Sequence, residues 1–220
     1  ITLTSTQNSK ENYGMISAGG ERAQIDNDGI INLNGYDYAA SKEVGYGMSI
    51  GDGRANNNNT ININRMYGYG MASTEGTLTN NGTINLTNGG YGIMGESGES
   101  FNNKDATITI TGTPNMQNSY GMSMQDGTAK NFGQIDVTGG SVNSETYGIS
   151  VNGGNGLNHG LINMHSDNAF GLFDEGDGEI TNVAGGTINL YGNNSVGMQT
   201  TSGKAENFGT INIGVDNGTG

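Results

Sequence analysis

The chain has 220 residues, no cysteine and a formal net charge of −13, with 21 acidic residues against eight lysines and arginines. Nucleic acid and anionic membrane surfaces are therefore poor partners, because no basic patch can neutralise phosphates, and the lack of cysteine excludes disulfides and thiolate metal sites. Glycine supplies 41 residues and hydrophobic residues only 32%, so a folded chain can have only a thin core.

One phrase occurs eight times: an aromatic-Gly-aliphatic triplet followed, usually fifteen residues later, by a short strand of the type Ile-Asn-Leu. The triplets begin at Tyr13, Tyr46, Tyr69, Tyr91, Tyr120, Tyr147, Phe170 and Val196, and the strand isoleucines are Ile31, Ile61, Ile84, Ile108, Ile135, Ile162, Ile188 and Ile211. The mean period is about 26 residues. Periods of about 20 to 50 residues indicate a solenoid, a propeller or another repeat array.

Each repeat contains three short strand-like pieces separated by Asp-Gly or Asn-x-Gly turn signals. In the repeat at 111–137, for example, period-two alternation places Tyr120, Met122 and Met124 on one face. Three strands in 22 to 33 residues predict one coil of a parallel β-helix, because a propeller blade needs about 40 residues or more. We therefore expect an all-β solenoid of about eight coils.

The repeats predict one elongated domain over residues 1–220. The expected coils are 4–33, 34–63, 64–86, 87–110, 111–137, 138–164, 165–190 and 191–213. Residues Ile1-Thr2-Leu3 look like the closing strand of a preceding repeat, and neither end shows an atypical capping unit. The chain is therefore interpreted as a segment of a longer array.

Stacking of coils converts each repeat position into a ladder along the rod. We expect the triplet aromatics to face inward, because Phe170 and Val196 replace tyrosine, and the triplet glycine to meet a backbone requirement. The alternative places glycine inside and tyrosine outside, as an exposed stripe. The triplet aliphatic residues and two apolar positions of the last strand are expected to complete the core.

An asparagine recurs at the corner before the last strand of each repeat. The positions are Asn27, Asn58, Asn80, Asn131, Asn158, Asn182 and Asn207, with Asn103 slightly out of register. Asparagine bonds neighbouring backbone at turns, and stacked amides can bond along a ladder. These residues are interpreted as structural rather than as a binding site.

Candidate contact residues lie in the connections between a last strand and the next triplet, because these vary from four to twelve residues while the rest of the repeat is nearly constant. Variable loops on a rigid scaffold are typical recognition sites, and tyrosine is a common contact anchor. The candidates are Tyr36, Asp37, Tyr38, Lys42, Glu43, Asn115, Gln117, Asn143 and Glu145. Insertions without a function are the alternative.

Few side chains suggest chemistry. The acidic group of Asp174, Glu175, Asp177 and Glu179 is a calcium candidate through oxygen ligands, although a solvated acidic corner explains it too and the repeating Gly-Gly-x-Gly-x-Asp calcium motif is absent. His159 and His165 share a repeat without a partner at a fixed spacing. We therefore expect no catalytic site and no cofactor.

Tandem units of the chain read Tyr-Gly-Met-x-x-x-x-Gly and then Asn-x-Gly-Thr-Ile-Asn-Leu. In these units the chain resembles the passenger regions of large type V autotransporter adhesins, especially the fusobacterial outer-membrane kind. The resemblance covers nearly all 220 residues. The resemblance implies a right-handed β-helical stalk outside a Gram-negative outer membrane, or released from it. The full-length protein would be anchored by a C-terminal translocator barrel.

Members of that family function in adhesion, so the resemblance implies that the partner is a protein or glycan on a host-cell or bacterial surface. The segment itself has no run of 18 apolar residues and is not expected to insert into a membrane. The alternatives are a carbohydrate-active β-helix enzyme, such as a polysaccharide lyase or hydrolase, and an ice-binding or purely structural solenoid.

Overall fold

The computed structural model of the chain describes residues 1–4, 11–20, 22–35, 44–64, 67–112, 118–139 and 144–214. Within these ranges every regular element is a β-strand, and the strands form three parallel sheets. No helix of the described residues is long and apolar enough to cross a membrane.

Each sheet collects one of the three predicted pieces of the repeat. Sheet A holds the Ile-Asn-Leu strands: β1 (Thr2–Thr4), β4 (Ile30–Asn34), β7 (Thr60–Asn64), β10 (Thr83–Thr87), β13 (Thr107–Thr111), β16 (Gln134–Thr138), β19 (Leu161–Met164), β22 (Thr187–Leu190) and β25 (Thr210–Ile213). Sheet B holds the triplets: β2 (Glu11–Ser17), β5 (Val44–Ile50), β8 (Gly68–Ser73), β11 (Gly90–Gly95), β14 (Ser119–Met124), β17 (Thr146–Val151), β20 (Ala169–Asp174) and β23 (Val196–Thr200). Sheet C holds the middle pieces: β3 (Gln24–Asn27), β6 (Arg54–Asn57), β9 (Thr77–Asn80), β12 (Glu99–Asn102), β15 (Thr128–Asn131), β18 (Asn155–Asn158), β21 (Glu179–Asn182) and β24 (Lys204–Asn207).

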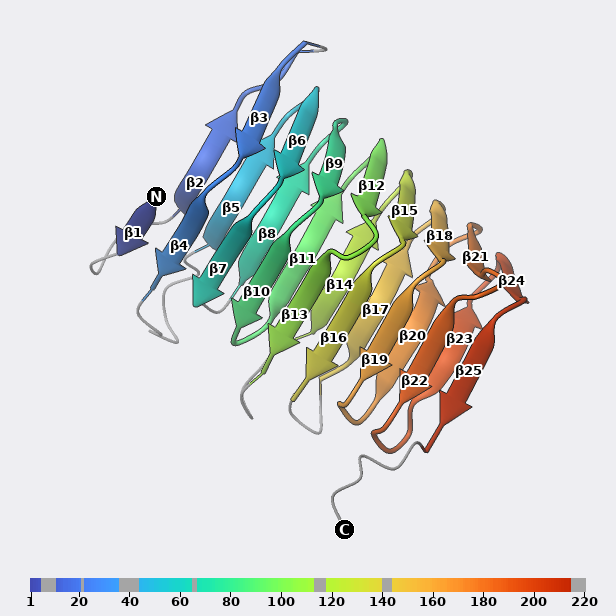
Figure 1. Cartoon of the computed structure of the whole chain (residues 1–220). Helices are drawn as coiled ribbons and strands as arrows, with labels where there is room; N and C mark the ends of the chain where they lie inside the picture. Colours follow the sequence, from blue (N-terminus) through green and yellow to red (C-terminus); the bar gives the residue numbers. More distant parts are fainter. Residues whose placement is uncertain are drawn as a thin grey trace.

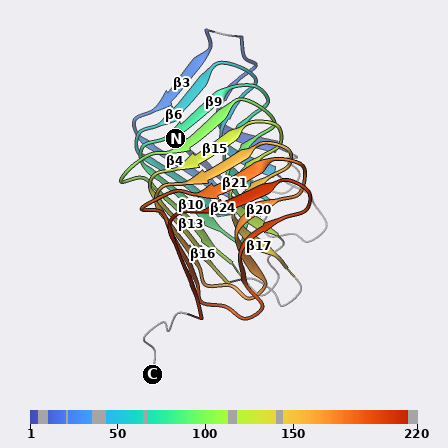
Figure 2. The same cartoon turned by 90° about the vertical axis from the view of Figure 1, so that its right-hand side faces the viewer.

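The strands pair with their equivalents in neighbouring repeats, so the chain winds as a β-solenoid. Figure 1 shows the equivalent strands of successive repeats side by side from the N-terminal to the C-terminal end, and Figure 2 shows the chain looping from sheet to sheet. In sheet B, Tyr46 lies opposite Tyr69, and Met48 lies opposite Met71. From β2 to β23 the pairings make about seven turns. The prediction of an all-β parallel solenoid with a repeat near 26 residues is confirmed.

Aliphatic ladders fill the interior as predicted. Met48, Met71, Ile93, Met122, Ile149 and Leu172 from sheet B are buried, as are Ile61, Ile84, Ile108, Ile135, Ile162 and Ile188 from sheet A. In the last described turn the ladder opens, and Ile213 is 65% exposed. Each interior side chain thus packs on its equivalents in the turns above and below, which removes apolar surface from water.

The triplet aromatic residues lie outside this core, so the prediction that they face inward is wrong. In β14, Ser119, Gly121, Met122 and Met124 are buried, whereas Tyr120 is half-buried on the outer face. Two consecutive buried residues, Gly121 and Met122, interrupt the alternation, and Tyr120 and Met122 therefore point to opposite sides. The strand phase changes at the glycine.

Packing against sheet A explains why this position is glycine. A Cβ atom built on Gly121 would lie 2.5 Å from Ile135 Cγ2 and 2.5 Å from the Gly148 carbonyl oxygen. Any side chain here would collide with the facing sheet and with the next turn, because interiors are close-packed. The backbone requirement is confirmed, but it sends the neighbouring tyrosine outward.

The recurring asparagine is structural, as predicted, with a corrected register. The ladder contains Asn57 and Asn102 where the sequence suggested Asn58 and Asn103. Its members are Asn27, Asn57, Asn80, Asn102, Asn131, Asn158, Asn182 and Asn207. Asn131 Nδ2, for example, donates to Asn158 Oδ1 at 2.9 Å and to the Leu161 carbonyl at 3.3 Å. The amide chain is buried from Asn27 to Asn182, and a chain of this kind fixes the register of successive turns.

Candidate contact surface

The predicted corner residues fall mostly outside the described part of the chain. Eight of the nine, namely Tyr36, Asp37, Tyr38, Lys42, Glu43, Asn115, Gln117 and Asn143, lie in the ranges that the structure does not describe. Glu145 is described and exposed, and its carboxylate accepts the hydrogen bond of the Tyr147 hydroxyl. The one described corner candidate therefore contacts the triplet aromatics.

The four acidic residues proposed as calcium ligands do not share one site in the structure. Asp174 is buried and accepts hydrogen bonds from Thr200 Oγ1 at 2.9 Å and from the Gly176 amide at 3.1 Å. Glu175 and Asp177 are exposed, and Glu179 lies 3.4 Å from Lys204 Nζ. Among the described residues, no three acidic, histidine or cysteine side chains form a group that could hold a metal ion.

Both histidines stack on aromatic rings. His159 lies 4.6 Å from Phe132 and His165 lies 4.2 Å from Tyr191, measured between ring centroids, with interplanar angles of 15° and 3°. Partial burial, followed by the positive charge of Lys130, lowers the pKa of His159. Each histidine therefore packs on an aromatic ring of a neighbouring turn of the solenoid.

The outer face of sheet B carries a continuous column of stacked rings, which we call the aromatic stripe. Its members are Tyr13, Tyr46, Tyr69, Tyr91, Tyr120, Tyr147 and Phe170. Neighbouring ring centroids are 4.5 to 5.2 Å apart and their planes differ by at most 15°. The spacing follows from in-register pairing, which places each ring one strand spacing from the next.

The stripe keeps neutral hydroxyl groups at ordinary pH. Burial is the main cause that raises the pKa of Tyr46, Tyr69, Tyr91 and Tyr120. Since ring contact needs only about 3.5 Å between planes, rings at the observed centroid spacing are offset, which leaves a strip of each face accessible beside the edge. The stripe thus presents a row of ring carbons beside a row of hydroxyl groups.

Tyr13, at the N-terminal end of the stripe, provides a test of this geometry. Its hydroxyl donates to Glu11 Oε2 at 2.7 Å, and this bond is the main cause that raises its pKa to about 12. The bond should therefore be intact below pH ~10 and lost as the pH rises through the folded-state pKa. Glu11→Gln should lower the ionisation midpoint in alkaline difference spectra taken against Tyr13→Phe. Glu99→Gln, away from the stripe, serves as the control, and an unchanged midpoint in Glu11→Gln would contradict the contact.

A groove of about 310 Å³ runs beside the N-terminal part of the stripe. The rings of Tyr13, Tyr46 and Tyr69 line it, together with the residues three positions after Tyr13, Tyr46, Tyr69 and Tyr91. These are Ile16, Ser49, Ala72 and Met94. The groove is open because Ser49 and Ala72 are too small to fill the space beside the rings.

Phe173 fills the equivalent position towards the C-terminus. Its ring centroid lies 5.2 Å from those of Tyr147 and Phe170, in tilted packing, and Tyr147 is only 5% exposed. At this end of the stripe the residue three positions after the aromatic therefore covers the rings instead of leaving space beside them. Sequence reasoning overlooked this position, although its change from serine and alanine to phenylalanine was a readable signal.

The comparisons with known proteins add no relative to this picture. No protein-family model, no curated protein and no solved structure matches the chain.

Proposed function

We propose that the chain is a non-catalytic adhesive segment of the autotransporter passenger type, a right-handed β-helical stalk of eight coils that acts outside the cell. It contacts a protein on a host-cell or bacterial surface through the open part of the aromatic stripe. The observation that carries this proposal is the groove beside Tyr13, Tyr46 and Tyr69, where stacked rings remain accessible on a rigid sheet.

The chemistry of the groove suits a protein partner. Tyrosine provides large amphipathic contact area with little side-chain entropy to lose, and it is enriched at binding hot spots. Here the stacking immobilises the rings before binding, so little further ordering is needed. Ile16 and Met94 add apolar contacts at the ends of the groove. The net charge of −13 favours a partner with a basic surface.

Packing of the ionisable side chains supports a role without catalysis. The two histidines stack on rings, and Asp174 is buried beneath donors from its own and the next turn. A general acid or base needs access to a substrate proton at hydrogen-bonding distance. These groups are instead committed to holding neighbouring turns together.

The test blocks the groove with a single charged side chain. Beads coated with the chain are applied to epithelial monolayers and to Gram-negative bacteria, and attachment is counted against beads coated with albumin. Ser49→Lys places an ammonium in the groove beside the rings and should reduce attachment about tenfold, the equivalent of ~1.4 kcal/mol. Ser123→Lys makes the same change at the equivalent outward position of β14, outside the groove, and should attach normally.

Two results would overturn the proposal. One is attachment of the unmodified chain no greater than that of albumin on every surface. The other is equal attachment of Ser49→Lys and Ser123→Lys, which would place contact elsewhere. Protease treatment of the target cells should abolish attachment, whereas glycosidase treatment should leave it intact if the partner is a protein.

A further inference from the structure

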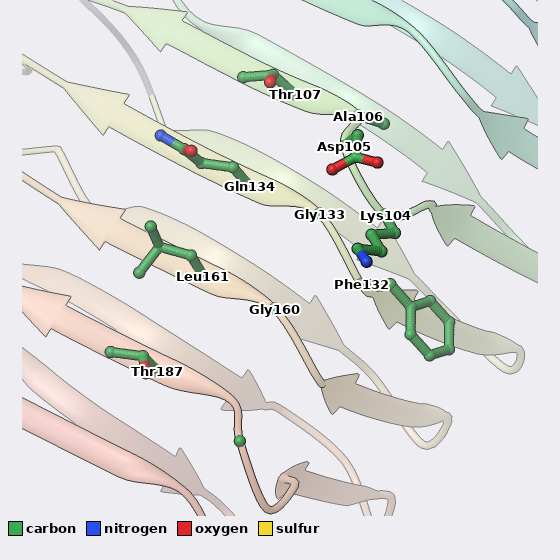
Figure 3. Close-up of a pocket in the computed structure, with 11 residues that line it drawn as sticks. Lys104, Asp105, Ala106, Thr107, Phe132, Gly133, Gln134, Gly160, Leu161 and Thr187 are labelled. Atoms are coloured by element: carbon green, nitrogen blue, oxygen red, sulfur yellow. The ribbon is translucent and has the colours of Figure 1, made fainter.

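A second hollow, of about 350 Å³, lies on the other side of the molecule, at the junction of sheets C and A. Figure 3 shows it over the beginnings of β16 and β19, with Lys104 and Phe132 at one side and Gln134 and Leu161 along the strands. It shares no lining residue with the groove beside the aromatic stripe.

Unequal corner lengths create this hollow. The chain passes from β15 to β16 and from β18 to β19 through two residues each, at 132–133 and 159–160. The corners before and after these, at 103–106 and 183–186, have four residues each. The expectation that insertions fall only between a last strand and the next triplet is therefore incomplete. The two four-residue corners thus stand on either side of the two two-residue corners, and the hollow lies between them.

The long corners are closed turns. The Ala106 amide donates to the Asn103 carbonyl at 3.0 Å, and the Gly186 amide donates to the Val183 carbonyl at 2.8 Å. Asp105 has φ of 70°, in the left-handed region that a turn of this kind uses. The two corners are three strand spacings apart, or ~14 Å. They therefore form fixed ends for an elongated small ligand.

The lining combines one aromatic surface with balanced polar groups. Phe132 is 39% exposed, and His159 stacks on its ring. Lys104 and Asp105 are exposed at one end, Thr187 lies at the other, and Gln134 lies between them. The ammonium donates hydrogen bonds, the carboxylate accepts them, and hydroxyl and amide groups do both.

We propose that this hollow binds a neutral carbohydrate of one or two pyranose rings. The C–H face of a sugar carries partial positive charge and suits the face of the Phe132 ring that His159 does not cover, while sugar hydroxyls match the mixed donors and acceptors. The charges of Lys104 and Asp105 cancel locally, and the net charge of −13 disfavours acidic sugars. The volume lies at the lower end of the range for small-ligand sites, roughly 300 to 1,000 Å³.

The experiment uses the whole chain and an array of neutral and acidic oligosaccharides, with hits measured by saturation-transfer NMR and calorimetry. Phe132→Ala should weaken binding of a neutral hit at least tenfold. Phe208→Ala is the matched control, because Phe208 follows the asparagine ladder at the equivalent position of a later turn, is 64% exposed and does not line the hollow. It should bind as the unmodified chain does.

A second variant removes one end of the hollow without touching the aromatic ring. Deleting Lys104 and Asp105 together with Ala106→Gly gives a two-residue corner ending in glycine, the form found at 132–133 and 159–160. The fold should be retained, as judged by circular dichroism, and sugar binding should be lost. Ser49→Lys should bind the sugar normally, which separates this site from the proposed protein contact.

Three results would overturn the proposal. The first is that no neutral oligosaccharide binds at millimolar concentration. The second is that acidic sugars are preferred, which would contradict the charge argument. The third is that Phe132→Ala and Phe208→Ala weaken binding equally, which would assign the effect to general surface hydrophobicity.

Discussion

Replacing Gly121 with valine should destabilise the solenoid by about 3 kcal/mol, the upper end of what overpacking usually costs. The new side chain would begin with a Cβ atom 2.5 Å from both Ile135 Cγ2 and the Gly148 carbonyl oxygen. One of these contacts is with the facing sheet and the other with the next turn, so a shift of one strand cannot relieve both. Urea unfolding followed by circular dichroism at 25 °C measures the change.

Gly29→Val is the matched control for this substitution. A Cβ atom at Gly29 would have no heavy atom within 4 Å, so its effect should stay within about 0.5 kcal/mol. If both variants lost stability equally, the triplet glycine would not be packed against sheet A. The interpretation with tyrosine facing the core would then return.

Asn131→Ala should have the second large effect, a loss of about 3 kcal/mol. Asn131 is buried and has amide neighbours on both sides in the ladder. Its removal leaves the Asn158 side-chain oxygen and the Leu161 carbonyl without this donor, and Asn102 Nδ2 without the Asn131 acceptor. An unsatisfied buried polar group costs about 1–3 kcal/mol. The same urea titration measures the loss.

Asn189→Ala provides the comparison on the outer face of sheet A. Asn189 Nδ2 donates to Asn163 Oδ1 at 2.9 Å and its own Oδ1 accepts from Asn212 Nδ2 at 2.8 Å, in a similar ladder that water can reach. Water can replace the lost partners, so the expected loss is less than about 1 kcal/mol. A loss as large as that of Asn131→Ala would mean that amide stacking, rather than burial, controls stability.

The failure at the tyrosines has a specific cause. Period-two alternation holds for Met122 and Met124, which are both buried, and it holds in the sheet A strands from β4 to β22. It fails between Tyr120 and Met122, because Gly121 and Met122 are consecutive buried residues. The glycine of every triplet was the signal for this change of phase. The valine at position 196, where other triplets have tyrosine, was interpreted as a sign of burial. Valine, however, also suits a half-buried position on the outer face.

The asparagine ladder shows a smaller error of the same kind. The sequence indicated a structural amide at each corner, which is confirmed, but at runs such as Asn56-Asn57-Asn58-Asn59 it could not select the inward member. Only Asn57 is aligned with Asn27 and Asn80 in sheet C. The choice depends on strand pairing between turns, and adjacent identical residues hide it in the sequence.

The period, the parallel all-β solenoid, the aliphatic ladders and the structural role of the corner asparagines could all be predicted from the sequence. These properties repeat in every unit, and stacking of equal units needs no information beyond one repeat. The predicted contacts of the corner residues Tyr36, Asp37, Tyr38, Lys42, Glu43, Asn115, Gln117, Asn143 and Glu145 stay predictions. The outward tyrosines, the groove beside them and the hollow between the long corners become visible only in the three-dimensional structure. Each depends on how residues from different turns or sheets meet: Gly121 against Ile135, Ser49 beside Tyr46 and Tyr69, and a short corner between two long ones.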